Sequence, residues 1–360
     1  MNKSLETKEC DTNDKNKLRV GVIGLGRLGL THAAIFNSLQ DSKLVAVMDP
    51  SKFPSKQLGV LNPSIKVFDK VETMFNNIEL DAVLIASPVS SHVPISLECV
   101  EKSIPFLLEK PLSINSKEAK PLLKRISEKP VPNMIGYVYR FLDSFRKGKE
   151  IIDTNCLGNI QRVSANMYIS QVFQKGKGWR FDPEVSGGGV LINNGSHVID
   201  LLTWYFGPVS VVNGNVLSVY TPGIDDFAHL YLKHKSGVNT IVDCSWSVRF
   251  KRKIDVKIDI LGNNGSLIVS DDTVQLFLDK AALGWPSGKT VYNANDLFTP
   301  VHVDIGTPKF TFQDQYFINC LESNENPIPD VNQAYHVQQV VDAGYKSSSE
   351  DGKPVEISII

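Results

Sequence analysis

The chain has 360 residues, of which 42% are hydrophobic and 21% are charged, and its formal net charge is −1. This length allows two domains, and the balanced charge gives no indication of binding to nucleic acid or to an anionic membrane surface. The five cysteines are odd in number and widely spaced, without the spacing of a metal site or the density of a disulfide scaffold, which favours a reducing compartment.

Residues 1–17 are the stretch least suited to folding. They are rich in Lys, Glu, Asp and Asn and contain one large apolar residue, Leu5. Such a stretch cannot bury enough apolar surface to fold, and it lacks the apolar core of a signal peptide. We therefore expect a disordered tail. Because no run approaches 18 apolar residues, we also expect a cytoplasmic protein without a membrane span.

A glycine motif follows the first predicted strand, residues 18–23, and precedes a predicted helix. Its sequence is Gly24-Leu25-Gly26-Arg27-Leu28-Gly29. Gly24 permits the tight turn, Gly26 lets a pyrophosphate approach the backbone, and Gly29 lets helix and strand pack closely. We predict that these six residues bind a dinucleotide. The alternative is a glycine-rich turn without a ligand.

An acidic residue, Asp49, ends the second predicted strand, residues 43–48, about 20 residues after Gly29. A carboxylate at this point can accept hydrogen bonds from ribose hydroxyls and would repel a 2′-phosphate, which favours NAD over NADP. The alternative is that Asp49 only begins the turn Asp49-Pro50-Ser51. The nearby Lys52 leaves NADP possible.

Further strands alternate with helices along the amino-terminal part. Residues 82–86, 104–108 and 134–137 are predicted strands, and helices are predicted to end near Lys102 and Glu128. This alternation indicates a doubly wound parallel sheet of the Rossmann type. Ligands bind such sheets at the carboxyl ends of the strands. The polar segments that follow two of these strands are therefore candidate site residues.

The most informative of these segments is Glu109-Lys110-Pro111, directly after the apolar strand at 104–108. By themselves, Glu109 and Lys110 could be surface charges where a strand meets solvent, with Pro111 ending the ladder. The glycine motif and Asp49 reverse this interpretation, because they place the strand end beside a dinucleotide.

These motifs, together with Ser87-Pro88 and His92 four residues further on, resemble the Gfo/Idh/MocA oxidoreductases, named for glucose-fructose oxidoreductase and inositol dehydrogenase. The resemblance implies that Lys110 hydrogen-bonds the reacting hydroxyl or carbonyl. It also implies that Glu109 and the turn from Ser87 to His92 line the nicotinamide side. A positive charge beside a developing alkoxide is favourable, which is a reason for lysine at this position.

A second motif lies in the carboxyl-terminal half, where Gly178-Trp179-Arg180 and Gly187-Gly188-Gly189 precede a predicted helix. Asn193 and His197 are four residues apart and would share a face of that helix. A histidine there can be a core or capping residue. The stretch is similar, however, to a second signature of the same family, which implies that His197 is the general acid and base and that Trp179 and Arg180 approach the cofactor.

Asn193 departs from the family pattern, because many members carry an aspartate four residues before the histidine. An amide can orient the imidazole or bind a substrate hydroxyl, but it cannot stabilise an imidazolium by charge. We therefore expect more of the catalytic work to fall to Lys110 and His197.

The remainder is predicted to form strands and a few helices. Predicted strands are residues 160–169, 227–232, 238–248, 254–260 and 265–269, and predicted helices are residues 141–153, 313–323 and 333–348. The strict alternation of 254–260 indicates one buried and one exposed face. We predict an α/β protein with a Rossmann domain at 18–138 and an α+β domain at 139–360 built on a large, mainly antiparallel open sheet. The apolar residues of 238–248, including Trp246, could pair with a second subunit as a dimer or tetramer, or could cover helices of their own chain.

The function predicted from these features is an NAD(P)-dependent oxidoreductase acting on a secondary alcohol or ketone of a sugar, sugar derivative or cyclitol, without a metal. The catalytic residues would be Lys110, His197 and Asn193, and the substrate would contact Lys110, Arg140, Asn193, Asn194 and His197. One alternative is a sugar-nucleotide or amino-sugar dehydrogenase or reductase, in which Lys175, Lys177 and Arg180 meet a phosphate or carboxylate. Another is a non-catalytic NAD-binding regulator, against which the presence of both Lys110 and His197 argues.

Overall fold

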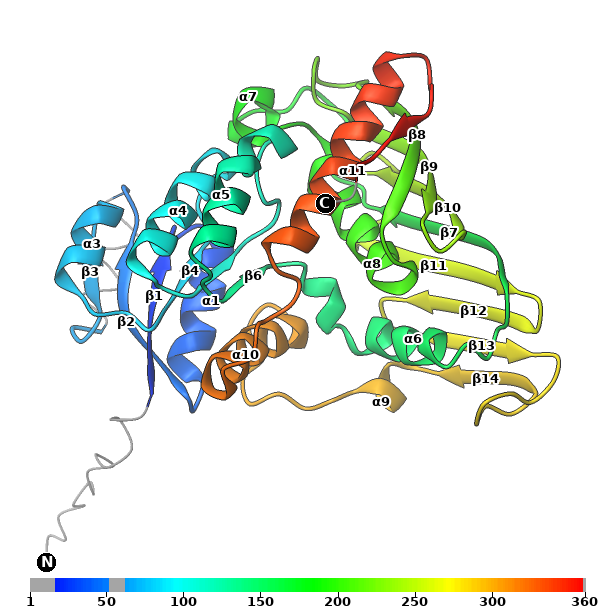
Figure 1. The fold of residues 1–360 in the computed structure, drawn as a ribbon, viewed down its shortest axis with the longest axis horizontal. Helices are drawn as coiled ribbons and strands as arrows, with labels where there is room; N and C mark the ends of the chain where they lie inside the picture. Colours follow the sequence, from blue (N-terminus) through cyan, green and yellow to red (C-terminus); the bar gives the residue numbers. More distant parts are fainter. Residues whose placement is uncertain (1–16, 52–61, 359–360) are drawn as a thin grey trace, which may run out of the picture.

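The computed structural model describes residues 17–51 and 62–358, which form two sheets and the helices around them (Figure 1). The predicted disordered tail, apart from Lys17, and Lys52 lie outside the described residues. Within the described part, no helix is long and apolar enough to cross a membrane.

The first sheet is wholly parallel, with strand order β3-β2-β1-β4-β5-β6. This order is that of a Rossmann fold, so the predicted doubly wound sheet is confirmed. Its strands are β1 (Leu18–Ile23), β2 (Ser42–Met48), β3 (Lys66–Phe68), β4 (Ala82–Ile85), β5 (Phe106–Leu108) and β6 (Asn133–Ile135).

Helices cover both faces of this sheet, because alternate residues of each strand belong to different apolar clusters. Val83 and Ile85 pack with residues of α3 (Val71–Asn77), α4 (His92–Lys102) and α5 (Ser116–Glu128). Ala82 and Leu84 pack with α1 (Arg27–Ser38). With both faces covered, the central strands β4 and β5 are apolar along their whole length.

The second sheet has nine strands in the order β14-β13-β12-β11-β7-β10-β9-β8-β15. All neighbours are antiparallel except β7 and β10, so the predicted mainly antiparallel sheet is confirmed. The strands are β7 (Ile160–Tyr168), β8 (Val209–Leu217), β9 (Phe227–His234), β10 (Asn239–Ser245), β11 (Asp255–Gly262), β12 (Gly265–Ser270), β13 (Val274–Leu278), β14 (Gly288–Tyr292) and β15 (Val355–Glu356).

Among the described residues, helices cover one face of the second sheet and leave the other uncovered. In Figure 1, α6 (Asp143–Asp153), α8 (Ser196–Phe206) and α11 (Val331–Ser349) lie on the side turned toward the first sheet. On the other face, Tyr231, Ile241 and Phe277 are 44%, 48% and 45% exposed. Trp246 does not belong to that face, because it is buried and its indole N–H donates to Asp226.

Helix α10 (Pro308–Ser323) returns from the carboxyl-terminal part to the first sheet and lies beside α1 (Figure 1). Its residues Phe317 and Ile318 join the apolar cluster that contains Phe36 of α1. Residues 308–323 therefore complete one face of the amino-terminal sheet. The domain boundary at residue 138 stays a prediction.

The short elements connect these layers. They are η2 (Val89–Ser91), η3 (Val138–Phe141), η4 (Trp179–Phe181), α7 (Pro183–Ser186), the π-helical turn η5 (Leu191–Gly195) and α9 (Ala294–Leu297).

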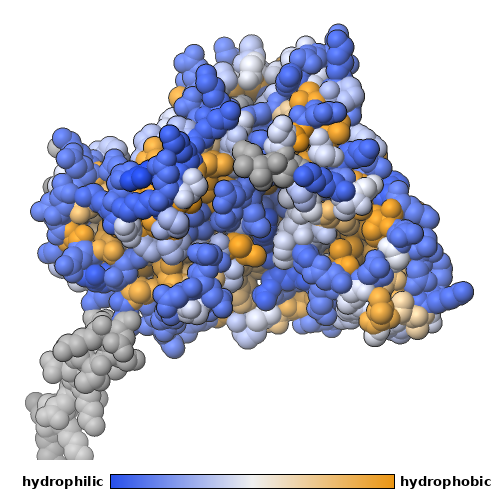
Figure 2. All heavy atoms as spheres, viewed as in Figure 1, coloured by the Kyte–Doolittle hydropathy of each residue, from blue (hydrophilic) through white to orange (hydrophobic). Residues whose placement is uncertain are grey.

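Figure 2 shows that hydrophilic residues cover most of the face seen in this view, with apolar residues in separate groups.

Candidate active site

A continuous groove runs along the carboxyl edge of the first sheet. It consists of two adjoining cavities that share Gly26, Ala86, Ser87 and Trp179. One end lies at Asp49, and the other lies between the loop after β5 and the η5 turn. The predicted residues that line it are Gly24, Gly26, Arg27, Leu28, Asp49, Ser87, Pro88, His92, Glu109, Lys110, Trp179, Arg180 and Asn193. Leu25, Gly29, Arg140, Asn194 and His197 do not line it.

The three glycines of the motif have different roles. Gly24 has a φ of +89°, and a Cβ on Gly29 would lie 1.8 Å from the Gly24 carbonyl oxygen, so both are required by the turn itself. Gly26 has a φ of −66°, and a Cβ there would meet no atom within 4 Å. Within residues 17–51 and 62–358, no side chain caps the first N–H groups of α1 beside it. Gly26 thus leaves open space beside the start of α1, as the predicted dinucleotide site requires.

Asp49 combines the two roles considered for it. Its Oδ2 accepts the Leu25 backbone N–H at 2.6 Å and its Oδ1 accepts that of Ser51 at 2.8 Å. The carboxylate therefore does form a turn, and it also ties β2 to the glycine motif. Each oxygen keeps a second acceptor site, and Asp49 lines the groove. Both interpretations of this residue are compatible with the structure.

His92 connects the loops that follow β4 and β5. Its Nδ1 lies 2.8 Å from the Pro111 carbonyl oxygen and its Nε2 lies 2.9 Å from that of Ser87. The ring is buried. It therefore holds the two strand-end loops together at the predicted nicotinamide side.

Lys110 bridges the two halves of the molecule. Its Nζ donates to the Asn193 carbonyl oxygen at 2.7 Å and to the Asn193 side-chain oxygen at 3.0 Å. Burial lowers the pKa of Lys110 to about 8, an effect that Glu109 opposes and Arg180 strengthens. Lys110 is therefore a cation at neutral pH that gives up its proton more easily than an exposed lysine.

The segment that carries Asn193 and His197 is not one regular α-helix. The π-helical turn η5 contains Asn193, and α8 begins at Ser196, just before His197. The predicted single helix is wrong in this detail, because the extra residue of a π turn changes the offset between successive side chains. Asn193 contacts Lys110, whereas the His197 ring packs edge-on against Tyr139, with ring centroids 5.0 Å apart.

His197 is enclosed, with 7% of the residue exposed. Its Nδ1 has no hydrogen-bond partner among residues 17–51 and 62–358. Burial lowers the pKa of His197 well below its usual value, and the charges of Lys110 and Lys309 lower it further. The imidazole is therefore neutral at physiological pH and can accept a proton.

Lys309 of α10 lies near His197, and the sequence motifs did not indicate this proximity. Its Nζ lies 4.2 Å from the centroid of the Tyr139 ring, which itself packs on His197. This contact places a second cation near the imidazole. No local pattern could have identified it, because Lys309 is far from His197 in sequence and lies on a different helix.

The glycines at 187–189 serve close packing. The Gly189 and Leu191 backbone N–H groups donate to Asp225 at 2.6 and 2.7 Å, and the Tyr345 hydroxyl donates to it at 2.8 Å. A Cβ on Gly188 would lie 2.2 Å from that hydroxyl oxygen. The loop is therefore fastened to Asp225 just before η5, which fixes the start of the turn that holds Asn193.

Two of the predicted substrate residues lie elsewhere. Arg140 is buried, and its guanidinium forms two bonds to Asp200, at 2.7 and 2.8 Å. It lines a separate cavity with Trp204 and Tyr316. Asn194 is partly buried outside the groove. The substrate roles of Arg140 and Asn194 stay predictions.

Family models match two stretches of the chain. A model described as "Oxidoreductase family, NAD-binding Rossmann fold" matches residues 18–137, and one described as "GFO/IDH/MocA C-terminal domain" matches residues 145–268. Together they cover more than half of the chain. The chain therefore belongs to the GFO/IDH/MocA oxidoreductase family, and its amino-terminal part is an NAD-binding Rossmann fold.

Individual proteins are similar over different lengths. An oxidoreductase of Formosa agariphila is 31% identical over 54% of this chain and 62% of that protein, less than two thirds of its length. The scyllo-inositol 2-dehydrogenase (NAD(+)) of Bacillus subtilis is 24% identical over 96% of this chain and 98% of that protein. The solved structure of levoglucosan dehydrogenase with NADH and levoglucosan has a TM-score of 0.87 at 18% identity, over 96% of this chain and 100% of that chain. At this identity it shows the fold alone.

Alanine substitutions at two glycines of the motif should separate an effect on NADH binding from an effect on folding stability. Gly26→Ala should weaken NADH binding by about tenfold or more, because its methyl group enters the groove, and should lower the free energy of unfolding by less than about 1 kcal/mol. Gly29→Ala should lower the free energy of unfolding by more than about 2 kcal/mol, because its Cβ meets a backbone oxygen. NADH fluorescence titration and urea denaturation measure the two effects. Unchanged NADH affinity in Gly26→Ala would contradict this placement of the cofactor.

Proposed function

We propose that this chain is an NAD-dependent oxidoreductase that transfers a hydride between nicotinamide and a secondary alcohol or ketone of a sugar, sugar derivative or cyclitol. The observation that carries the proposal is the bond from Lys110 to Asn193 at one end of the groove, directly before the turn of helix that bears the neutral His197. This arrangement combines a cation and a base beside the NAD-binding fold.

The relatives support this substrate class. The Bacillus relative is named for oxidation of an inositol with NAD, and the similar fold of levoglucosan dehydrogenase was solved with NADH and levoglucosan. Both names describe compounds with secondary hydroxyl groups. Asp49 at the opposite end of the groove is compatible with NAD, because its carboxylate would repel a 2′-phosphate.

We assign the chemical roles as follows. Bound NAD would accept the hydride from the carbon that carries the hydroxyl. His197 would take the hydroxyl proton on its imidazole, and the Lys110 ammonium would stabilise the negative charge that develops on the oxygen. Asn193 would hold Lys110 in place through its two oxygens. In the reverse direction, Lys110 would polarise the carbonyl, and protonated His197 would return the proton to the oxygen.

A second candidate substrate class is a sugar that carries an anionic group, such as a sugar nucleotide. Arg180 lines the groove wall and lowers the pKa of Lys110, which burial already lowers. Arg180 also lies over the Trp179 ring, 5.6 Å from its centroid. A phosphate or carboxylate on the substrate would offset this concentration of positive charge. Comparing turnover of free sugars with that of nucleotide-linked sugars distinguishes the two classes.

We also propose that the protein is a cytoplasmic homo-oligomer. The four described cysteines, Cys99, Cys156, Cys244 and Cys320, are free, which suits a reducing compartment and can be checked by cell fractionation. Tyr231 and Ile241 are cross-strand neighbours on the uncovered face of the second sheet, and a second copy would bury them.

Substitution of the two proposed catalytic residues tests the function. Lys110→Ala and His197→Ala should each reduce kcat by about 100-fold or more on a polyol substrate, because each removes a group that acts on the reacting oxygen. Wild-type protein would first be screened with NAD against a panel of sugars and cyclitols, followed by absorbance of NADH. Full turnover in both variants would show that the assignment is wrong.

The pH dependence of ketone reduction should reveal the deprotonation of the Lys110 ammonium. Its pKa of about 8 means that the ammonium loses its proton, and its ability to polarise the carbonyl, as the pH rises above 8. We expect kcat/KM for ketone reduction to fall more steeply above about pH 8 than below it, because the loss of the Lys110 charge adds to any effect of His197. Lys110→Arg should remove this break, because a guanidinium stays charged. A wild-type profile that stays level to pH 10 would exclude the role of Lys110 as a titrating cation.

A charge on the uncovered sheet face should change the oligomeric state. Ile241→Glu should lower the molar mass measured by light scattering after size-exclusion chromatography, because it would place an unpaired charge in the interface. Leu283→Glu is the control, since Leu283 is 66% exposed but lies in the loop between β13 and β14. A wild-type monomer, or equal masses for all three proteins, would contradict assembly through this face.

A further inference from the structure

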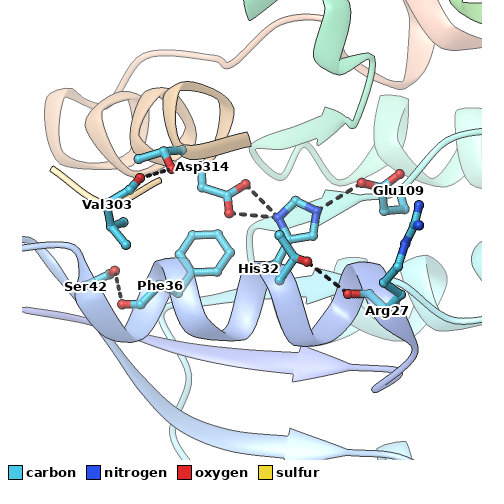
Figure 3. Close-up of polar contacts among 9 residues, drawn as sticks. Arg27, His32, Phe36, Ser42, Glu109, Val303 and Asp314 are labelled. Atoms are coloured by element: carbon cyan, nitrogen blue, oxygen red, sulfur yellow. Dashed lines mark hydrogen bonds and ion pairs between the residues drawn. The ribbon is translucent and has the colours of Figure 1, made fainter. Parts of the chain in front are cut away.

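A buried histidine connects α1, α10 and the loop after β5. The His32 Nδ1 lies 2.9 and 2.7 Å from the two carboxylate oxygens of Asp314, and its Nε2 lies 3.0 Å from the Glu109 Oε1 (Figure 3). The side chains of His32 and Asp314 have no exposed surface, and that of Glu109 is 8% exposed. We refer to Asp314, His32 and Glu109 as the relay cluster.

The geometry favours a charged imidazole. Both ring nitrogens face carboxylate oxygens, and an imidazole can donate from both nitrogens only when it is protonated. Burial opposes this charge, but the two carboxylates outweigh burial and raise the pKa of His32 to about 10. At neutral pH, His32 therefore donates to Asp314 and to Glu109 at the same time.

Glu109 is the member of the cluster that reaches the groove. It lines the groove next to Lys110, and its only hydrogen bond among residues 17–51 and 62–358 that involves the side chain is the one from His32 to Oε1. Oε2 therefore keeps its full capacity to accept. Gly136 makes room for this side chain, because a Cβ there would lie 3.2 Å from Oε1.

We propose that His32 and Asp314 are positioning residues that hold Oε1 of Glu109, so that Oε2 is presented to the groove as an acceptor for a hydroxyl or amide donor of the nicotinamide riboside. The proposal rests on the proposed function for the identity of the ligand. Asp314 fixes the ring plane of His32 by contacting Nδ1 with both oxygens, and His32 in turn fixes Glu109. A fixed acceptor contributes more affinity than one that must be ordered when the ligand binds.

A purely structural role is the competing explanation. A buried ion cluster between α1 and α10 would affect the stability of the fold, and its loss would leave the groove of the folded protein unchanged. The two explanations differ in what they predict for cofactor affinity. They also differ in whether the effect of His32 depends on Glu109.

A double-mutant cycle of NADH affinity tests the proposal. We expect Glu109→Gln and His32→Gln each to weaken NADH binding by about tenfold or more, in line with the loss of a hydrogen bond to a charged group. The double variant should bind no more weakly than Glu109→Gln alone, because His32 acts only through Glu109. Asp314→Asn should also weaken binding, although Asp314 does not line the groove.

Ser42→Ala is the matched control. Its hydroxyl donates to the Phe36 carbonyl oxygen at 2.8 Å within buried surroundings at the other end of α1 (Figure 3). This variant should lose stability and keep the NADH affinity of the wild type. All affinities would be measured by NADH fluorescence titration on variants whose folding is verified by circular dichroism, with Asp314→Asn serving if His32→Gln does not fold.

The outcomes are distinct. NADH affinity within twofold of wild type in the folded relay variants overturns the proposal, and so does an effect of His32→Gln that adds fully to that of Glu109→Gln. Failure of the proposed function would instead appear as absent turnover in wild-type protein across the substrate panel. Equilibrium binding of NADH is therefore a separate readout from catalysis.

Discussion

The hydrogen bonds from Lys110 to Asn193 join the two halves of the site. Lys110 follows the parallel sheet and Asn193 lies in the π-helical turn before α8, so this contact closes the groove at one end. The partner atoms are neutral oxygens, which satisfy the donors of the ammonium without cancelling its charge. Burial can therefore lower the pKa of Lys110 to about 8, a value at which a lysine can be charged in one step and neutral in another.

The asparagine has a second consequence, which concerns His197. An aspartate at position 193 would place a negative charge beside Lys110 and would favour an imidazolium nearby. With an amide there, the charges that act most strongly on His197 are those of Lys110 and Lys309, and its pKa falls well below its usual value. The roles predicted from the sequence are compatible with these charges, because His197 on α8 is a neutral base and Lys110 after β5 is a cation.

Local patterns were sufficient for most strands and helices and for the line of the groove, because strand ends in a parallel sheet meet at one edge. They did not indicate β3, β8, β13, β14 and β15. The features that were missed depend on contacts between distant segments. His32 follows the glycine motif on α1, which carries other polar residues such as Thr31, and only the return of α10 brings Asp314 beside it. The pairing of Arg140 with Asp200 on α8 is also a contact between distant segments that no local pattern indicates. The π turn likewise cannot be read from residue spacing, because a helix of regular period is the default for such a sequence.

Helix α10 places two constraints on the site at once. Lys309 in its first turn contributes to the low pKa of His197, and Asp314, little more than one turn further on, holds His32 and through it Glu109. Asp314 and His32 are buried as an ion pair, so the helix cannot shift along α1 without leaving these two charges uncompensated. Because one helix carries both contacts, the proposed acceptor on the cofactor side and the protonation of the proposed base depend on the same element. Under these proposed roles, a change in the position of α10 relative to α1 would alter cofactor affinity and proton transfer together.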